Sequence, residues 1–396
     1  MRVGQRLLIG VAVAVCARPS AGDDRTRLPS FFENSYIRLT GGVGTFGFTD
    51  ANLAPNLHST GILNDRATFG VSAGHYFEPW LALQIGLIRP VLWVEYKGVL
   101  GPGSSSSVRP TILALTARPE LTLSDRFKVY AEMGAAYIAR IGFNGPGGTP
   151  AVSSGVLWTP LTGGGVLYTW NAHWHVDATA IVTWANHRAN EPSIRYGALG
   201  LVYLFGPSAS SLGASAGGYD WPLNLLEGGF FQRRLFYWDA NRVVSTSSVP
   251  LFFAGQIKAR SGYTLMYERN VFHTARWFSL NWGLSAGRWA SAVRGESFYT
   301  LSVFPAIRLW PVHSSFVDSY IAYSLAGPAY LSRVVIDGRD TGGRFTFQDY
   351  IGIGVLLGTG KHLDLDLKLL HYSNGNLLTH NPGVAPPLTV NMGYAW

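Results

Sequence analysis

Hydrophobic and polar residues alternate along most of this chain with a period of two, the period of a β-strand whose two faces meet different surroundings. In the first such stretch, Ile37 and Leu39 share one face, while Arg38 and Thr40 share the other. Each stretch is about as long as a tilted strand needs to cross a membrane, roughly 9–11 residues. The stretches in the first half of the chain are 35–48, 66–76, 80–91, 108–121, 127–141, 155–168, 173–184 and 194–205.

The alternation breaks at 206–250, where a piece rich in Ser and Gly precedes a mixed, aromatic piece. We interpret 207–250 as a linker with a possible first strand of a second unit. Alternation resumes at 251–271, 277–289, 297–309, 319–331, 345–358, 363–373 and 388–396. The pattern predicts an all-β fold of two eight-stranded antiparallel barrels in tandem, at 30–206 and 251–396. One sixteen-stranded barrel is the alternative.

The N-terminal residues have the form of an export signal. Arg2 and Arg6 precede an apolar run, Leu7 to Ala17, that is too short to span a bilayer as a helix. We therefore expect 1–22 to be a signal peptide. The single cysteine, Cys16, would be lost with it, so the mature chain would have no thiol chemistry.

Composition supports a membrane protein that crosses with strands. Aromatic residues make up 13% of the chain and charged residues 14%, and there are 47 glycines. Beyond the signal no apolar run is long enough for a membrane helix, about 18 residues. The net charge of +8 suits contact with anionic lipid headgroups, and export makes nucleic acid an improbable partner. We expect the protein in the outer membrane, with an N-terminal barrel loosely similar to small OmpA-like or porin-like domains.

The chain ends on Trp396, an aromatic residue of the kind that barrels place at their periplasmic interface. Counted back from it, the strand at 363–373 ascends and its upper end lies in the outer leaflet. Leucines occupy one face of this strand, and two acids and a lysine occupy the other, so the leucines should face lipid. The same parity puts His371 and Ser373 on the lipid face. Residues two apart on a strand are about 6.6 Å apart, so the imidazole can reach toward the hydroxyl.

The preceding strand carries Asp349 among apolar residues. If Leu357 opposes Leu363 across the short turn, Asp349 falls opposite His371. Directly paired side chains have Cβ atoms about 4.5–5.5 Å apart, near enough for a carboxylate to orient an imidazole. We predict a nucleophile, a base and an orienting acid in Ser373, His371 and Asp349. The competing interpretation is that these are polar residues of a barrel rim.

The last part of the chain, about 251–396, resembles the PagL-type lipid A 3-O-deacylase family. The resemblance rests on the motif His371-Tyr372-Ser373-Asn374-Gly375-Asn376, and also on the segments 326–328, 337–342, 345–349 and 381–383. It implies that Ser373 attacks an ester of lipid A, that His371 takes its proton, and that Asn374 and Gly375 hold the oxyanion. The product would be the released 3-linked hydroxyacyl chain.

The sequence departs from this family at one position. The best-known members have a glutamate where this chain has Ala385, so either Asp349 supplies the acid or activity is impaired. The alternatives to a deacylase are a phospholipid esterase and a non-catalytic barrel such as a porin, an adhesin or a structural protein.

Three arginines of the outer loop beside the site, Arg333, Arg339 and Arg344, are candidates to bind lipid A phosphates. They are equally well explained as solvated loop charges. We expect no cofactor and no metal ion, because no group of His, Cys, Asp and Glu has the spacing of a metal site. The expected partners are lipopolysaccharide and other outer-membrane lipids.

Overall fold

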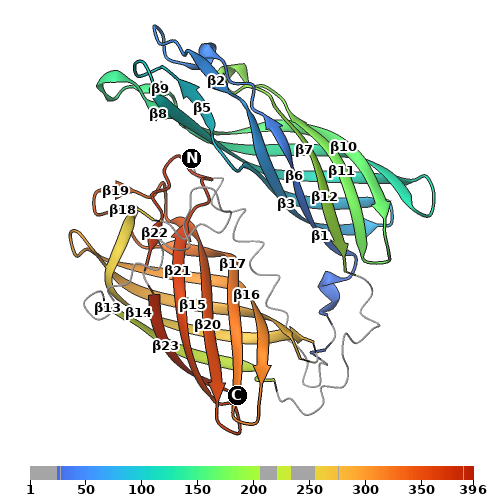
Figure 1. Ribbon diagram of the computed structural model, residues 1–396, viewed down its shortest axis with the longest axis vertical. Coiled ribbons are helices and arrows are strands. Elements are labelled where there is room, and N and C mark those ends of the chain that lie inside the picture. Colours follow the sequence, from blue (N-terminus) through green and yellow to red (C-terminus); the bar gives the residue numbers. More distant parts are fainter. Residues whose placement is uncertain (1–24, 27, 206–220, 233–254, 275, 387) are drawn as a thin grey trace. The chain divides into compact units, whose positions relative to one another are not determined.

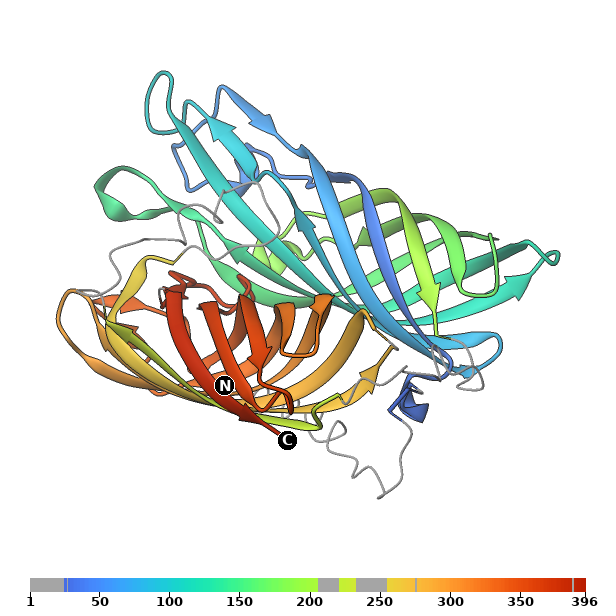
Figure 2. The ribbon, with the colours of Figure 1, turned by 60° about the horizontal axis from the view of Figure 1, so that its bottom comes forward.

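The computed structural model describes residues 25–26, 28–205, 221–232, 255–274, 276–386 and 388–396. Within them the chain forms two closed antiparallel β-barrels, shown in Figure 1 and, turned toward the reader, in Figure 2. In the part described, no helix is long and apolar enough to cross a membrane. The expected signal at 1–22 lies outside the described residues, as does most of the expected linker.

The N-terminal barrel is closed by eight strands that follow one another around the ring, and the ring is completed where the first and last of them pair. They are β1 (Ser35–Thr45), β3 (Asp65–Glu78), β4 (Leu81–Pro90), β6 (Ser105–Thr122), β7 (Phe127–Ile141), β10 (Gly155–Thr169), β11 (Trp174–Thr183) and β12 (Ile194–Leu204). Shorter strands extend its long loops: β2 (Gly61–Leu63), β5 (Val94–Lys97), β8 (Phe143–Asn144) and β9 (Pro150–Val152). Short 3₁₀ turns lie at Ser30–Phe32, Asp50–Asn52, Pro146–Gly148 and His187–Ala189. The predicted first barrel is confirmed.

The interior of this barrel is filled by a buried polar network. Arg38 Nε donates to Asp177 Oδ2 at 2.7 Å, and Arg38 Nη1 lies 3.3 Å from Glu132 Oε2. Tyr130 donates to the other oxygen of Asp177 at 2.7 Å, and Gln84 donates to Glu132 at 2.9 Å. Toward the end with the long loops the interior is instead apolar. This cluster includes Phe46, Phe48, Val94, Tyr96, Ile138 and Leu161.

We expect the full chain to form no ion channel in a planar lipid bilayer. An eight-stranded barrel is just wide enough for side chains to fill, and here a charged network and an apolar cluster both occupy it. Single-channel recording of the refolded protein checks this expectation, with heat-unfolded protein as the control. Discrete conductance steps that require the folded protein would contradict it.

The C-terminal barrel is a separate closed ring. Its strands are β13 (Asn224–Gln232), β14 (Ile257–His273), β15 (Phe278–Ser291), β16 (Ser297–His313), β17 (Val317–Leu331), β20 (Phe345–Leu357), β21 (Leu363–Ser373) and β23 (Leu388–Ala395). Its outer loops carry β18 (Val335–Ile336), β19 (Arg339–Asp340) and β22 (Val384–Ala385). The first strand, β13, pairs with both β14 and β23 and so closes the ring. The alternative of one sixteen-stranded barrel is wrong, because β12 pairs back onto β1.

The wall of this barrel has the predicted alternation. On β21, Leu363 and Leu365 are exposed outward, whereas Asp364, Asp366 and Lys368 are buried inside. Short turns join the strands at one end, and the longer connections 332–344 and 374–387 lie at the other. An apolar outer band, a polar interior and this asymmetry of loops are features of barrels that span the outer membrane.

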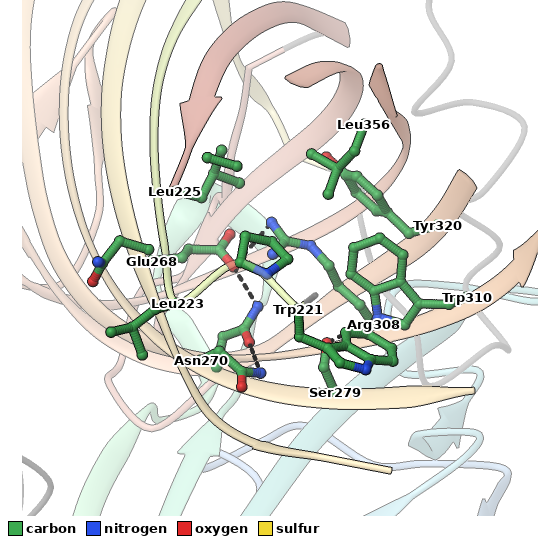
Figure 3. A pocket seen from close by; sticks show the side chains of 14 residues that line it. Trp221, Leu223, Leu225, Glu268, Asn270, Ser279, Arg308, Trp310, Tyr320 and Leu356 are labelled. Carbon is green, nitrogen blue, oxygen red and sulfur yellow. Dashed lines mark hydrogen bonds and ion pairs between the residues drawn. The ribbon is translucent and has the colours of Figure 1, made fainter. Parts of the chain in front are cut away.

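The lumen of the C-terminal barrel is lined by hydrogen-bonded polar side chains, some of which Figure 3 shows. Arg308 Nη2 lies 3.0 Å from Glu268 Oε2, and Asn281 donates to the same carboxylate oxygen at 3.0 Å. Asn281 in turn accepts a hydrogen bond from Asn270, and Tyr350 donates to the second oxygen of Glu268 at 2.7 Å. These contacts tie together strands that lie far apart in the sequence.

In the same lumen three acids lie close to one lysine. Carboxylate oxygens of Glu227, Asp364 and Asp366 all lie within 4.8 Å of one another, a juxtaposition that residue spacing did not reveal. Lys368 Nζ lies against Glu227 and contacts Asp366 Oδ2 at 2.6 Å. The ammonium group therefore compensates this acidic cluster from within, and we assign the cluster a structural role.

Replacing Lys368 with methionine should destabilise the C-terminal barrel by about 3–5 kcal/mol, because it leaves buried carboxylates without their cation. Urea unfolding of the full chain in lipid bilayers measures the change. A chain that also carries Glu227→Gln and Asp366→Asn should regain much of the loss. Equal stability of the Lys368→Met chain and the parent would show that the cluster does not depend on this charge.

Candidate active site

The candidate catalytic residues lie on two neighbouring strands, β20 and β21. Leu357 pairs with Leu363 at the turn between them, and the same register places Asp349 opposite His371. Phe347 lies opposite Ser373. The predicted register is therefore confirmed.

The burial of their neighbours shows which way these side chains face. Gln348 and Tyr350 on β20 are buried in the lumen, as are Leu370 and Tyr372 on β21. Residues that alternate with these belong to the outer face of the wall. Asp349, His371 and Ser373 have that parity, and all three occur toward the end of the barrel with the long loops. By parity an acid, an imidazole and a hydroxyl thus share one side of the wall. The expected exposure does not hold for His371, which is buried.

Asp349 is held in place from the neighbouring strand β17. A bulge between Ser324 and Gly327 gives Ala326 a left-handed φ of 40°, and its N–H donates to Asp349 Oδ1 at 2.7 Å. A side chain at position 327 would collide with Phe304, at 2.4 Å from its Cβ, so glycine is required there. This gives a structural role to the segment 326–328 that the resemblance singled out.

The second oxygen of Asp349 points toward the base. Asp349 Oδ2 lies 3.6 Å from His371 Nδ1, beyond hydrogen-bond length but within reach of a small side-chain movement. Contacts of this kind are often long in a catalytic site without substrate. The Asp349 side chain is 21% exposed and that of His371 only 3%, so the acid is the more exposed member of the pair.

A short strand covers the other edge of β21. Val384 of β22 pairs with Tyr372, and β22 also runs parallel to β14. One further step along this antiparallel ladder brings Ala385 to the position opposite His371. Ala385 is fully buried. The imidazole thus has Asp349 on the neighbouring strand to one side and, to the other, Ala385, where the resemblance led us to expect a glutamate.

The two predicted oxyanion residues differ in their hydrogen bonding. Asn374 donates from its side chain to Thr341 O at 2.9 Å and from its backbone to Asn381 Oδ1 at 3.2 Å. Gly375 has a left-handed φ of 65° and begins the turn that follows β21. Within the described residues its N–H has no acceptor. Of the two, Gly375 therefore has the backbone donor better suited to an oxyanion.

The three loop arginines all lie at this end of the barrel, and each donates a hydrogen bond to the protein. Arg333 Nε donates to Ser297 O at 2.9 Å, Arg339 Nη1 to Gln256 Oε1 at 2.5 Å, and Arg344 Nη1 to the Tyr330 hydroxyl at 2.5 Å. Each guanidinium group has five N–H donors, so others remain. Their role toward phosphates stays a prediction.

The fold defines a class, a β-barrel protein of the cell outer membrane. Its candidate catalytic residues lie in the wall of the C-terminal barrel, toward the end with the long loops. Residues 258–394 match the family model "Lipid A 3-O-deacylase (PagL)". The resemblance inferred from the sequence is confirmed for this region. The match does not include the N-terminal barrel.

Solved structures similar to the chain include small outer-membrane barrels. The outer-membrane enzyme PagL is 16% identical, and the alignment covers 43% of this chain and 97% of that one with a TM-score of 0.30. The N-terminal barrel of Pseudomonas aeruginosa OprF is 15% identical over 44% and 98%, with a TM-score of 0.28. Ail of Yersinia pestis is 13% identical over 44% and 99%, with a TM-score of 0.31. No curated protein matches the chain.

Proposed function

We propose that the protein is an outer-membrane lipid A 3-O-deacylase that acts through Ser373, His371 and Asp349. The observation that carries the proposal is the pairing of Asp349 with His371, two residues before Ser373, on the outer face of the wall. The family match over 258–394 supports the same activity.

In the proposed reaction the Ser373 hydroxyl attacks the carbonyl carbon of the 3-linked ester, and His371 accepts the hydroxyl proton. The tetrahedral oxyanion is stabilised by the N–H of Gly375. Collapse breaks the bond to the sugar oxygen, which leaves with the proton held by His371. Water then hydrolyses the acyl-serine, which releases the hydroxy fatty acid and restores Ser373.

The position of the site suits a substrate that stays in the membrane. The strand ends that carry Ser373 and Asp349 are those joined by the long outer loops, and outward leucines lie below them on β21. An ester at the base of a lipid headgroup would meet the site at this level while its acyl chains stay in the bilayer. Asp349 supplies the orienting acid that Ala385 does not.

The deciding experiment is mass spectrometry of lipid A from a Gram-negative host that expresses the protein. The control is the Ser373→Ala chain at an equal level in the outer membrane. We expect lipid A to lose one 3-linked hydroxyacyl chain with the parent protein only. Phospholipids from the same cells should be intact.

Two other results would redirect the assignment. Intact lipid A with accumulation of lysophospholipid would identify a phospholipid esterase. If cells with the parent and cells with the Ser373→Ala chain have the same lipids, and both chains are folded, a non-catalytic barrel is favoured. The alanine at position 385, where a glutamate was expected, is the reason to test this alternative.

A further inference from the structure

A second group of side chains stands on the outer wall of the C-terminal barrel, away from the β20–β21 site. It consists of Arg260 and Tyr263 on β14, Arg288 on β15 and Tyr299 on β16, and we call it the Arg–Tyr strip. Tyr263 pairs directly with Arg288, and Arg288 pairs with Tyr299. The Arg288 guanidinium lies 5.8 Å from the centre of the Tyr299 ring. Its members are exposed, with Tyr263 at 63% and Tyr299 at 50%.

A bulge in β14 gives Arg260 its place in the strip. Ala259 pairs with Ser291 and Ser261 with Ala290, so Arg260 is the extra residue between two rungs of the ladder. Without the bulge Arg260 would share the inward parity of Gly262. Bulges commonly re-aim a side chain in this way. Its guanidinium lies beside Gly295, about 3.4 Å from where a Cβ there would be.

The strip occupies the level at which lipid headgroups begin. It lies just inside the β15–β16 connection, at the end of the barrel with the long outer loops. Immediately below it the wall is apolar, with Leu265, Leu284 and Leu301 all exposed. Arginine and tyrosine directly above an apolar band match the interface of a membrane-spanning barrel.

Among the residues that the structure describes, no carboxylate pairs with these two arginines. Among the described residues neither Arg260 nor Arg288 forms an ion pair. The nearby Asp337 already accepts hydrogen bonds from the Ser291 hydroxyl and from the N–H of Arg294, and its own N–H donates to Glu296. Within the described part of the barrel, the strip therefore has cations without a paired carboxylate at the level expected for a membrane interface.

We propose that Arg260 and Arg288 bind the phosphate groups of lipid A in the outer leaflet. Guanidinium groups match phosphate geometry with paired N–H donors, and the two tyrosines offer hydroxyl donors beside them. Only the choice of lipid A over another anionic lipid rests on the proposed function. At the outer end of the wall, above β13 and β23, β22 joins β21 to β14, so these two strands are two ladder steps apart there, about 10 Å. Arg288 stands one strand further, on β15. One lipid can thus contact the strip while its ester lies near Ser373.

Binding is tested on the full chain in detergent micelles, with Ser373→Ala to prevent turnover. The probes are lipid A with both phosphates and lipid A from which both have been removed, titrated by native mass spectrometry. The added substitutions are Arg260→Gln with Arg288→Gln. The matched control is Arg276→Gln, an exposed arginine in the turn at the opposite end of the same two strands.

We expect the double substitution to weaken binding of phosphorylated lipid A about tenfold, which corresponds to about 1.4 kcal/mol, and Arg276→Gln to leave it unchanged. Lipid A without phosphates should bind equally to all chains. Retention of parent affinity by the double variant, or equal affinity of the parent for the two lipids, would overturn the proposal. If the glutamine variant does not fold, the two lysine replacements, which keep charge but lose the paired donors, should give an intermediate loss. Because no turnover is involved, a failure here is separate from a failure of deacylation.

Discussion

Replacing Ser373 with alanine is expected to lower the rate of lipid A deacylation by about 10⁶-fold, the loss that follows removal of the nucleophile from a comparable triad. Alanine keeps the outward position on β21 and removes only the attacking oxygen. The register of β20 and β21 does not depend on this hydroxyl, so the barrel should fold as before. The measurement is the rate of hydroxy fatty acid release from lipid A micelles by the purified full chain.

The matched control for this experiment is Ser297→Ala. Ser297 is an exposed serine at the outer end of another strand, β16. It should retain the parent rate, because its side chain lies away from the β20–β21 ladder. A Ser373→Ala chain that releases fatty acid as fast as Ser297→Ala would exclude Ser373 as the nucleophile.

Replacing Asp349 with asparagine should lower the same rate by as much as about 10⁴-fold, since an amide cannot hold the imidazole in the required tautomer. The effect on stability should be small, because an amide oxygen can still accept the hydrogen bond from Ala326. The same fatty acid assay measures the loss. Glutamate at position 349 keeps the charge and should restore part of the rate.

A suitable control for the acid is Asp340→Asn, which changes an exposed carboxylate in the outer loop. It should leave turnover within about twofold of the parent, since solvated rim charges contribute little. If Asp349→Asn and Asp340→Asn were equally active, the imidazole would be oriented without Asp349. Asp349 would then not compensate for the glutamate that is expected at position 385 and is absent from this chain.

Alternation along the strands allowed most of the fold to be predicted. A period of two assigns faces without any knowledge of the tertiary structure, so the leucines of β21 and the pairing of Asp349 with His371 both followed from it. A short turn fixes register, and the turn after Leu357 did so here. The strand β13 was harder to place, because it lies in a stretch whose composition hides its boundaries.

Alternation could not predict the places where the pairing of neighbouring strands is irregular. The bulge that brings the Ala326 N–H to Asp349 inserts residues and changes parity, and the bulge at Arg260 does the same. The cluster of Glu227 with Asp364 and Asp366 depends on closure of the ring, which joins the first strand of the barrel to its last ones. Local sequence carries no signal for such contacts.

The hydrogen bond from Ala326 to Asp349 also has a consequence for when the protein can act. Asp349 is held by a hydrogen bond from β17, and His371 and Ser373 lie on β21. The other edge of β21 is covered by β22, which in turn pairs with β14. A chain in transit through the periplasm has none of these neighbours in place. The proposed site would therefore be assembled only when the barrel closes in the outer membrane, so the inner membrane is not exposed to the hydrolase during export.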